Sequence, residues 1–423
     1  MPPPPPSTGF RPDRALSATA EIDAVSRSGA VRSPGAGGRR KLIHVTTVDM
    51  SLDLLLKPQL QAFARAGYEV VGASAPGPHV GALEAAGIRH VALANATRAM
   101  DPRRDLALIG ELYRLFRHER PDIVHLHNPK PGWFGRPAAR AARVPVVVNT
   151  VHGLYATPED SWPRRAVVYG LERLAAACSH AELLQSVEDV AVLRRLRVPA
   201  NRIHVLGNGV DLSRFSVPTT EARAAARARF GVTEDQVAVG VVARLVWEKG
   251  LAEVIEAASA LRETDPQVRW LVVGPLDSDK SDGLVEADLA RVSGESGITF
   301  LGQRSDVEDC YRALDVYVLA SYREGFPRSA MEAAATGVPL VVTDIRGCRQ
   351  VVDDGGNGLL VRARDAGSLS EAVSVLANDG RRRAHMGEAS RVKAVEEFDQ
   401  RRVIDITLAT YRRLLGERGL SAP

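Results

Sequence analysis

Two glutamates that could bind hydroxyl groups, Glu324 and Glu332, stand eight positions apart in the segment EGFPRSAMEAAATG. Pro327 suits the first position of a helix, and the backbone N–H groups after it would then be available to an anion such as phosphate. A carboxylate can accept hydrogen bonds from two neighbouring hydroxyls, so Glu324 suits a sugar and Glu332 suits a ribose. Two solvated charges near a helix start would give the same pattern, and the segment alone leaves both interpretations open.

Two cations, Arg244 and Lys249, lie in the segment VARLVWEKG. We expect Arg244 at the end of a buried strand and Lys249 at the start of the next helix, where the helix dipole disfavours a positive charge. Such cations could neutralise a diphosphate and stabilise it as a leaving group. The alternative is a pair of surface charges with Glu248 as a local partner. We favour diphosphate binding, because ligands bind beyond the carboxyl ends of parallel strands.

Three histidines follow or end apolar runs in the first half of the chain. His152, in VVNTVHGLY, could hydrogen-bond a substrate hydroxyl or act as an acid or base. His125 and His127, in HLHNPKPG, would face the same side of a strand, so a metal pair is conceivable. Since no Asp, Glu or Cys nearby completes a ligand set, we expect satisfied, partly buried histidines there and no metal.

Several classes of protein are disfavoured. The sequence has no Walker A motif and no G-x-S-x-G elbow, and residues 46–53, after the first expected strand, contain no glycine of a dinucleotide-binding fingerprint. The cysteines are widely spaced, which fits a reduced compartment. The net charge is +4, and residues 1–40 hold six Arg and three acids, so the remaining chain is nearly neutral and nucleic acid is not an expected partner.

The elements that must position these residues follow a repeating order. Residues 1–40 are rich in Pro, Ser, Gly, Ala and Arg, which predicts a disordered tail. From residue 41 short apolar strands alternate with amphipathic helices, the pattern breaks at GNGVDLSRFSVP, and it restarts at Val237. This order predicts an α/β protein with two doubly wound parallel-sheet, Rossmann-like domains. With facing sheet ends, the motifs above would line a cleft between them.

Taken together, these residues resemble the retaining glycosyltransferases of family 4, which have the GT-B fold. The matching segments are GNGVD at 207, VVARLVWEKG at 241, LGQRSDVEDCY at 301, EGFPRSAMEAAATGVPLVVTDIRGCRQVV at 324 and DGGNGLLV at 354. NPKPGWFGR and NTVHGLY are also similar to this family, nearest to its bacterial polysaccharide and lipid-linked oligosaccharide members. The resemblance covers about residues 41–415.

The resemblance implies roles for the residues above. Arg244 and Lys249 would hold the donor diphosphate, Glu332 the ribose and Glu324 the transferred sugar, with His152 near the anomeric centre. The further donor contacts that it implies are Gln303 and Arg304 for the base and the backbone of Gly325, Phe326 and Pro327 beside the sugar. Retaining members need no protein nucleophile, and we expect no metal or other cofactor.

One departure from the family concerns the loop after the first expected strand. Many members carry a glycine pair there, whereas this chain has TTVDMSLD, so we assign no donor-binding residue to it. The expected organisation is a tail at 1–40, an N-terminal acceptor-side domain at 41–215, a C-terminal nucleotide-sugar-binding domain at 216–400, and a C-terminal helix at 401–423 that crosses back to the N-terminal domain.

The expected reaction moves a hexose or N-acetylhexosamine from a nucleoside-diphosphate sugar, with a UDP-sugar favoured, to a lipid-linked or polysaccharide acceptor, as in exopolysaccharide biosynthesis. One alternative is a soluble small-molecule acceptor. Another is a nucleotide-sugar epimerase of the same fold. Such an enzyme needs side chains that abstract a proton near the sugar, and His152 and Glu324 are the only candidates that we see. A non-catalytic sugar-nucleotide binding protein is disfavoured, because the full charged set is present.

The expected location is the cytoplasm. No apolar run approaches the length of a membrane span, and MPPPPPSTGF lacks the apolar core of a signal peptide. In WFGRPAARAAR the aromatic residues Trp133 and Phe134 precede Arg136, Arg140 and Arg143, and this edge could contact the anionic inner face of the plasma membrane. An ordinary packed helix with one basic edge is the alternative. We expect Arg346 and Arg349, in TDIRGCRQ, to be surface charges.

Overall fold

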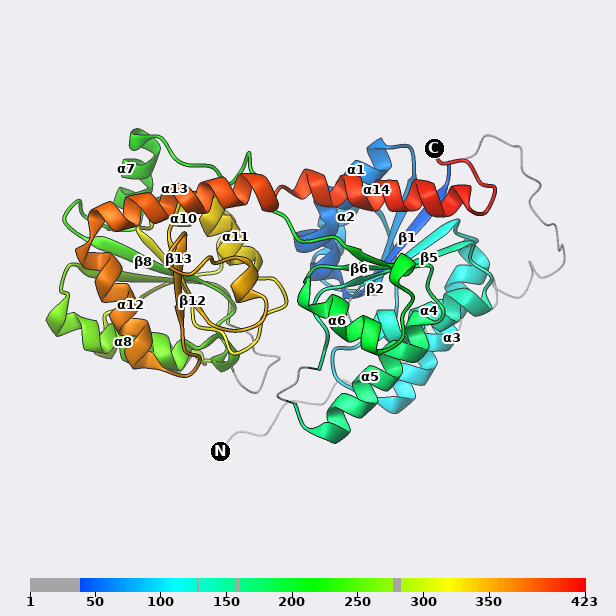
Figure 1. Cartoon of the computed structure of the whole chain (residues 1–423), viewed down its shortest axis with the longest axis horizontal. Helices are drawn as coiled ribbons and strands as arrows, with labels where there is room; N and C mark the ends of the chain where they lie inside the picture. The colour runs from blue at the N-terminus through cyan, green and yellow to red at the C-terminus, as the bar shows by residue number, and fades with distance from the viewer. Residues whose placement is uncertain (1–38, 128, 157–159, 277–282) are drawn as a thin grey trace, which may run out of the picture. The chain divides into compact units, whose positions relative to one another are not determined.

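Two parallel β-sheets organise the chain (Figure 1). The computed structural model describes residues 39–127, 129–156, 160–276 and 283–423, so the tail expected at 1–40 lies almost wholly outside the described residues. Within these ranges, seven strands are ordered β3-β2-β1-β4-β5-β6-β7 and six are ordered β10-β9-β8-β11-β12-β13. Neighbouring strands run parallel, which confirms the predicted pair of Rossmann-like sheets. The domain limits remain a prediction.

The first sheet alternates with helices along the chain. Its strands are β1 Lys41–Val48, β2 Glu69–Ala75, β3 Arg89–Ala92, β4 Ile123–His127, β5 Val146–Val151, β6 Ala181–Leu184 and β7 Ile203–Val205. Its helices are η2 Ser51–Leu56, α1 Lys57–Arg65, α2 Val80–Ala85, α3 Pro102–Glu119, α4 Pro129–Ala141, α5 Trp162–Ala176, α6 Glu188–Arg195 and η3 Ala200–Arg202. All residues of β4 and β5 are buried, as expected for strands covered on both faces.

The second sheet repeats the arrangement. Its strands are β8 Val237–Val242, β9 Val268–Val273, β10 Thr299–Gly302, β11 Val316–Leu319, β12 Leu340–Thr343 and β13 Gly358–Val361. Its helices are α7 Thr220–Arg229, η4 Trp247–Lys249, α8 Leu251–Thr264, α9 Glu286–Ser296, α10 Val307–Ala313, α11 Arg328–Ala335, η5 Cys348–Gln350, α12 Ala366–Asn378 and α13 Gly380–Glu397. Side chains of one face pack with α8 and α12, and those of the other face pack with α10 and α11, so both faces are covered.

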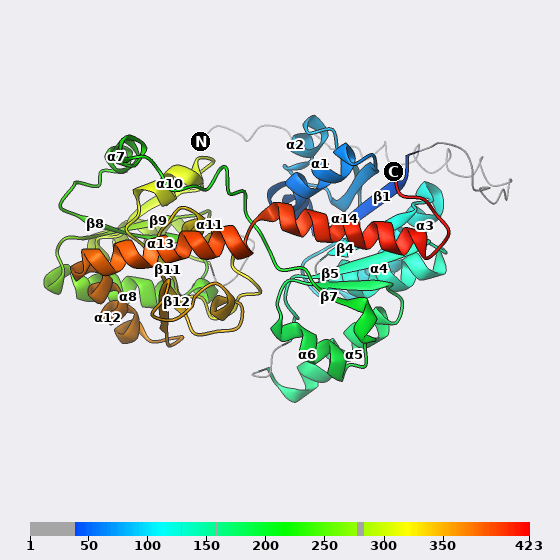
Figure 2. The same ribbon diagram turned by 45° about the horizontal axis from the view of Figure 1, so that its top comes forward.

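The last helix, α14 Gln400–Gly416, belongs to the core of the first sheet (Figure 2). The Asp399 side chain caps its start by accepting a hydrogen bond from the backbone N–H of Arg401. Tyr411, Leu414 and Leu415 are buried in one apolar cluster with residues of β1, β4 and α1. This packing carries the Tyr411 ring into the interior beside the strands.

The structure corrects one expectation about α4. Trp133 is 4% exposed and its indole N–H donates to Glu172, while Arg136 is 0% exposed and pairs with Glu172 and Glu182. Neither side chain can therefore reach a membrane surface. Two buried carboxylates hold the guanidinium inside, as in the alternative of a packed helix, whereas Arg140 and Arg143 are exposed and their contact with a membrane stays a prediction. Among the residues that the structure describes, no helix is long and apolar enough to cross a membrane.

Candidate functional site

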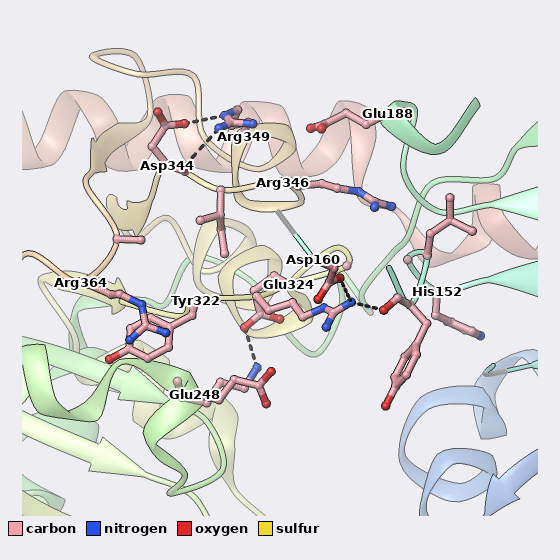
Figure 3. Close-up of a pocket in the computed structure, with 18 of the residues that line it drawn as sticks. His152, Asp160, Glu188, Glu248, Tyr322, Glu324, Asp344, Arg346, Arg349 and Arg364 are labelled. Atoms are coloured by element: carbon pink, nitrogen blue, oxygen red, sulfur yellow. Dashed lines mark hydrogen bonds and ion pairs between the residues drawn. The ribbon is translucent and has the colours of Figure 1, made fainter. Parts of the chain in front are cut away.

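A cavity of about 950 Å³ lies where the carboxyl ends of β5, β8, β11 and β12 come together (Figure 3). This position is the one at which parallel α/β sheets bind ligands. The cationic side chains that line it are Arg244, Lys249, Arg323, Arg346, Arg349 and Arg364, and the acidic ones are Asp160, Glu188, Glu248, Glu324 and Asp344. The volume suits a ligand of several ring systems, and the cations suit one that carries negative charge.

Lys249 and Glu324 form an ion pair inside this cavity. The Nζ of Lys249 lies 2.6 Å from Oε1 of Glu324, and the Ser321 hydroxyl donates to the same oxygen at 2.7 Å. Gly250 permits this approach: its φ is +72°, and a Cβ on it would lie 2.0 Å from the carbonyl oxygen of Ala320. The turn after η4 therefore packs directly on the end of β11, which places an ammonium group against a carboxylate.

His152 enters the same cavity from the end of β5. A Cβ on Gly325 would lie 2.1 Å from the carbonyl oxygen of His152, so only glycine fits where these two turns meet. Of the residues predicted from the sequence, the structure brings together His152, Arg244, Lys249, Glu324 and Gly325 around one cavity. The proximity of these residues was expected from the rule that ligands bind beyond the carboxyl ends of parallel strands, which we call the strand-end rule. The direct contact between the turns of His152 and Gly325 was not expected.

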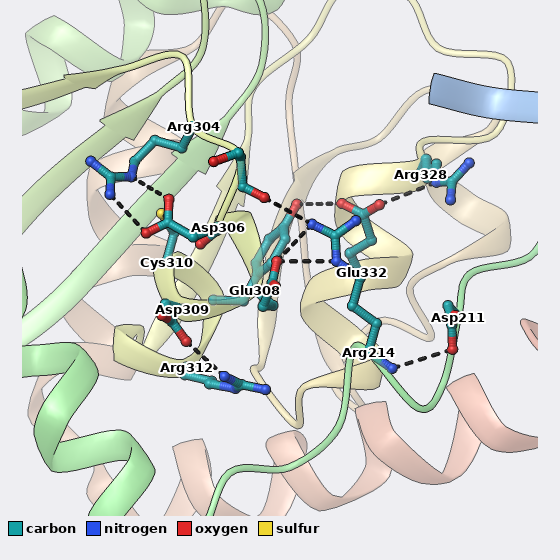
Figure 4. A network of polar contacts seen from close by, with 12 residues as sticks. Asp211, Arg214, Arg304, Asp306, Glu308, Asp309, Cys310, Arg312, Arg328 and Glu332 are labelled. Atoms are coloured by element: carbon teal, nitrogen blue, oxygen red, sulfur yellow. Dashed lines mark hydrogen bonds and ion pairs between the residues drawn. The ribbon is translucent and has the colours of Figure 1, made fainter. Parts of the chain in front are cut away.

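The other predicted donor residues, all within the described part of the chain, do not line this cavity: Gln303, Arg304, Phe326, Pro327 and Glu332. Glu332 accepts hydrogen bonds from the Tyr311 hydroxyl at 2.9 Å and from Nε of Arg328 at 3.1 Å (Figure 4). Burial raises the pKa of the Glu332 carboxyl, and these two partners oppose the shift.

Arg304 binds Asp306 through two hydrogen bonds of 2.7 Å each, and Gln303 beside it is exposed (Figure 4). The backbone carbonyl of Phe326 accepts a hydrogen bond from the Asn208 amide at 3.3 Å, and the Phe326 ring packs on Phe398. Pro327 is the N-cap residue of α11, so the helix begins at Arg328, one position after the predicted start. The roles of these residues in donor binding remain predictions.

Several cavity residues were missed from the sequence. Arg346 and Arg349 were expected to be surface charges, and both line the cavity. Arg349 is indeed exposed and lies 2.5 Å from Asp344, whereas Arg346 is mostly buried and contacts the buried Asp189 of α6. They follow the carboxyl end of β12, so the strand-end rule that selected Arg244 would also have selected them.

Tyr322 and Arg364 form another part of the wall that the sequence did not indicate. The Arg364 guanidinium lies 3.9 Å from the centre of the Tyr322 ring. The Tyr322 hydroxyl donates to Glu253 of α8 at 2.7 Å, and burial together with this carboxylate raises the pKa of Tyr322 to about 12. The phenol therefore stays protonated at neutral pH and presents a cation-covered ring to the cavity.

The expectation of satisfied histidines at the end of β4 agrees with the structure. His125 and His127 are 1% exposed, and ring nitrogens of these two residues and of His44 lie within 4.8 Å of one another. His44 Nδ1 is 2.8 Å from His127 Nε2, which is a hydrogen-bond distance; two nitrogen ligands of a tetrahedral zinc ion would stand about 3.3 Å apart. Hydrogen bonding thus satisfies these histidines, and His44 is a third potential metal ligand that the sequence did not indicate.

Burial keeps these imidazoles neutral. It lowers the pKa of His44 to about 3 and that of His152 to about 4, the latter against an opposing hydrogen bond with Gln185. The pKa values of His125 and His127 are held well below the ordinary value, by burial first and by neighbouring imidazoles second. At neutral pH His152 can therefore offer one N–H donor and one lone pair to its surroundings.

The chain matches two described sequence families, "Glycosyltransferase Family 4" over residues 59–214 and "Glycosyl transferases group 1" over residues 222–393. It is 31% identical over 279 residues to the UDP-Gal:alpha-D-GlcNAc-diphosphoundecaprenol alpha-1,3-galactosyltransferase of Escherichia coli, a match that covers 65% of this chain and 71% of the relative. It is 32% identical over 313 residues to the D-inositol 3-phosphate glycosyltransferase of Mycolicibacterium smegmatis, covering 70% of this chain and 68% of the relative.

Among solved structures, HepE of Anabaena in complex with UDP and glucose has a similar fold. The TM-score is 0.74 at 21% sequence identity, and the match covers 88% of this chain and 99% of that protein. At this sequence identity the similarity shows the fold of the chain. It does not identify the ligand of the cavity.

Proposed function

The chain belongs to the family 4 glycosyltransferases and has the GT-B fold, and we propose that it transfers a hexose or N-acetylhexosamine from a UDP-sugar to a lipid-linked or polysaccharide acceptor. The observation that carries the site assignment is the Lys249–Glu324 pair in a cavity that Arg244 and His152 also line. That arrangement places groups suited to a diphosphate next to groups suited to sugar hydroxyls.

The donor side of the proposal rests on charge. Arg244 and Lys249 line the cavity with four further arginines, and cations at fixed positions stabilise the charge that grows on a departing diphosphate. Because side chains of this chain can supply that charge, we propose that no metal ion is required. Uracil as the base is supported by the E. coli relative, whose name gives UDP-galactose as donor.

The sugar side rests on Glu324 and His152. Glu324 Oε1 is held by Lys249 and Ser321, so this carboxylate is positioned to orient a sugar hydroxyl. His152, neutral at pH 7, is suited to hydrogen-bond a second hydroxyl near the reacting carbon. Transfer with retention of the anomeric configuration is part of the proposal, with the leaving diphosphate accepting the proton of the acceptor hydroxyl.

The acceptor side has two candidates. The name of the E. coli relative indicates a diphosphoundecaprenol-linked sugar, which supports a lipid-linked acceptor and action at the inner face of the plasma membrane. The M. smegmatis relative is named for D-inositol 3-phosphate, and its 32% identity favours a soluble polyol phosphate as the second candidate. We place the lipid-linked acceptor first, since the segments NPKPGWFGR and NTVHGLY resemble those of lipid-linked and polysaccharide members of the family.

Thermal denaturation with a panel of nucleotide sugars tests the donor. A ligand that binds only the folded protein raises Tm, so UDP-sugars should raise it and GDP- or ADP-sugars should not. The acceptor is then tested by mass spectrometry of reactions that contain a polyprenyl diphosphate sugar or an inositol phosphate. Product with the inositol phosphate alone would reject the lipid-linked acceptor, and a Tm rise with GDP- or ADP-sugars alone would reject the UDP-sugar.

A further inference from the structure

A chain of hydrogen-bonded imidazoles leads from the interior of the first sheet to the cavity. His44 Nδ1 lies 2.8 Å from His127 Nε2, and His127 Nδ1 lies 3.1 Å from His152 Nε2. His44 is 0% exposed and His127 is 1% exposed, whereas His152 lines the cavity. Both ring nitrogens of His127 are therefore committed to other imidazoles, and one of those imidazoles belongs to the candidate site.

The sheet topology produces this chain. Strands β1, β4 and β5 are adjacent and parallel, with His44 opposite His125 and His127 opposite Thr150 in the register. Since side chains alternate along a strand, His125 and His127 point to the same face as His44. His152 follows β5 directly, so its ring can meet the ring of His127 where the two strands end.

A second set of contacts holds the interior end of the row of imidazoles, at His44 and His125. The Tyr411 hydroxyl of α14 lies 2.5 Å from His125 Nδ1 and 3.4 Å from His44 Nε2, and His125 Nε2 lies 2.7 Å from the Thr150 hydroxyl. The Tyr411–His44 contact is the longest in the series and thus the weakest. The two short links through His127 carry the coupling to the cavity.

The neutral state of the imidazoles limits the directions in which they can donate hydrogen bonds to one another. Each ring has one N–H donor and one acceptor nitrogen, so His127 must donate to one neighbour and accept from the other. His44, His127 and His152 therefore share one direction of donation, and reversing it would require all three protons to move together. A partner at a fixed position also holds the plane of the ring, as the partners of catalytic and metal-bound histidines do.

We propose that His127, oriented in turn by His44, is a positioning residue that fixes the tautomer and ring plane of His152 beside the sugar in the cavity, together with the Gln185 side chain, which also hydrogen-bonds His152. This inference rests on the proposed function. It assigns a role to buried histidines that contact neither donor nor acceptor, and it explains why both nitrogens of His127 face imidazole nitrogens. A metal site at His44, His125 and His127 would compete with it, since the nitrogens would then be ligands.

Two substitutions of His127 separate the positioning role from packing. The side-chain amide of Asn lies near the place of Nδ1, so His127→Asn retains a partner for His152; the amide of Gln lies near the place of Nε2, so His127→Gln retains only the link to His44. Both variants remove the imidazole ring, so both lose the packing contacts of that ring. We expect kcat to fall about 10- to 100-fold in His127→Gln and much less in His127→Asn, with the donor KM unchanged in each.

The imidazole ¹⁵N shifts of His152 give a readout that does not depend on activity. We expect one tautomer in the wild type and in His127→Asn and a mixture in His127→Gln. Should both variants unfold, the pair His44→Asn and His44→Gln provides the same contrast, because His44 reaches His127 through Nδ1. Failure of the proposed function would leave the protein without transfer activity while these shifts still changed.

The proposal is overturned if the His152 tautomer is the same in both variants of a pair and their kcat values are equal. It is also overturned if the purified wild type carries one tightly bound metal ion per chain that is lost in His44→Asn. A shift to mixed tautomers in His127→Gln together with a selective loss of kcat supports it.

Discussion

The Nζ of Lys249 lies 2.6 Å from Oε1 of Glu324, although 75 positions separate the two residues in the chain. Lys249 ends the short helix after β8, and Glu324 follows β11, the neighbouring strand in the sheet. The contact unites the group suited to the diphosphate with the group suited to the sugar. It makes the pair the centre of the proposed transfer site.

Removing either member of this pair should abolish most of the transfer. Loss of one positioned charge that stabilises a developing anion costs about 10²- to 10³-fold in kcat, so Lys249→Ala and Glu324→Ala should each lose at least that factor. Both side chains line the cavity, so water can reach the partner that remains, and circular dichroism should show an intact fold. Arg140→Ala, an exposed change on α4, is the matched control. Wild-type turnover in either variant would reject the site assignment.

The contact between the turns of Gly325 and His152 makes a second prediction. A Cβ on Gly325 would lie 2.1 Å from the carbonyl oxygen of His152, so Gly325→Ala must displace one of the turns. A displacement of about 1 Å can cost about 10²-fold in rate, and we expect a loss of that order.

Gly110→Ala, in α3, is the control for this substitution, because no atom lies within 4 Å of the added Cβ. It should leave kcat unchanged and raise stability by up to about 1 kcal/mol. If Gly325→Ala and Gly110→Ala had equal kcat, the contact between the turns would have no part in the reaction.

The buried histidines predict loss of stability in acid. The pKa of His44 is lowered to about 3 and that of His152 to about 4, whereas an unfolded chain titrates near 6.5. Below pH 6.5 the unfolded state therefore binds protons that the folded state does not bind. The free energy of unfolding falls by about 1.4 kcal/mol for each pH unit of acidification and for each such histidine. This dependence should continue until the folded pKa is reached.

Urea denaturation between pH 7.5 and 4.5 measures this effect. His44→Asn should reduce the proton uptake on unfolding by about one below pH 6.5, and Arg140→Ala should leave it unchanged. A free energy of unfolding in His44→Asn with the wild-type pH dependence would show that His44 is not held neutral in the folded protein.

The guanidinium of Arg136 should contribute strongly to stability. It lies 2.7 Å from Glu172 and 2.8 Å from Glu182, and its side chain is 0% exposed. Arg136→Met would leave two buried carboxylates without their cation, which costs about 3–5 kcal/mol. Arg140→Met, on the same helix but exposed, should change stability by less than about 0.5 kcal/mol. Equal midpoints for the two variants in urea would contradict this account of the buried network.

Sequence reasoning located much of the cavity wall because the physics of parallel sheets is regular. Apolar runs alternating with helical periods predicted both sheets, and the strand-end rule then placed His152, Arg244, Lys249 and Glu324 at one edge. The strand-end rule requires only that the end of each strand be known, and the periodicity of apolar residues predicts those ends from the local sequence. It would also have found Arg346, which was instead taken for a surface charge because its partner Asp189 lies 157 positions away.

The remaining features depend on the order of strands and on which partner covers a helix face. His44 meets His127 because β1 and β4 are adjacent in the sheet, a neighbourhood that no local pattern reveals. Arg136 was expected on a basic edge, but Glu182, 46 positions away, holds it in the interior. The ribose contact of Glu332 stays a prediction, and its hydrogen bonds with Tyr311 and Arg328 are further contacts that no local pattern indicates.

The most direct test of the account is transfer itself, measured by mass spectrometry with a UDP-sugar and a polyprenyl diphosphate sugar in parallel reactions of the wild type and Lys249→Ala. We expect the acceptor to gain one hexose or N-acetylhexosamine with the wild type and the product of the variant to fall by at least about 10²-fold. Equal product from the two proteins, or no product from the wild type with any nucleotide sugar, would contradict it.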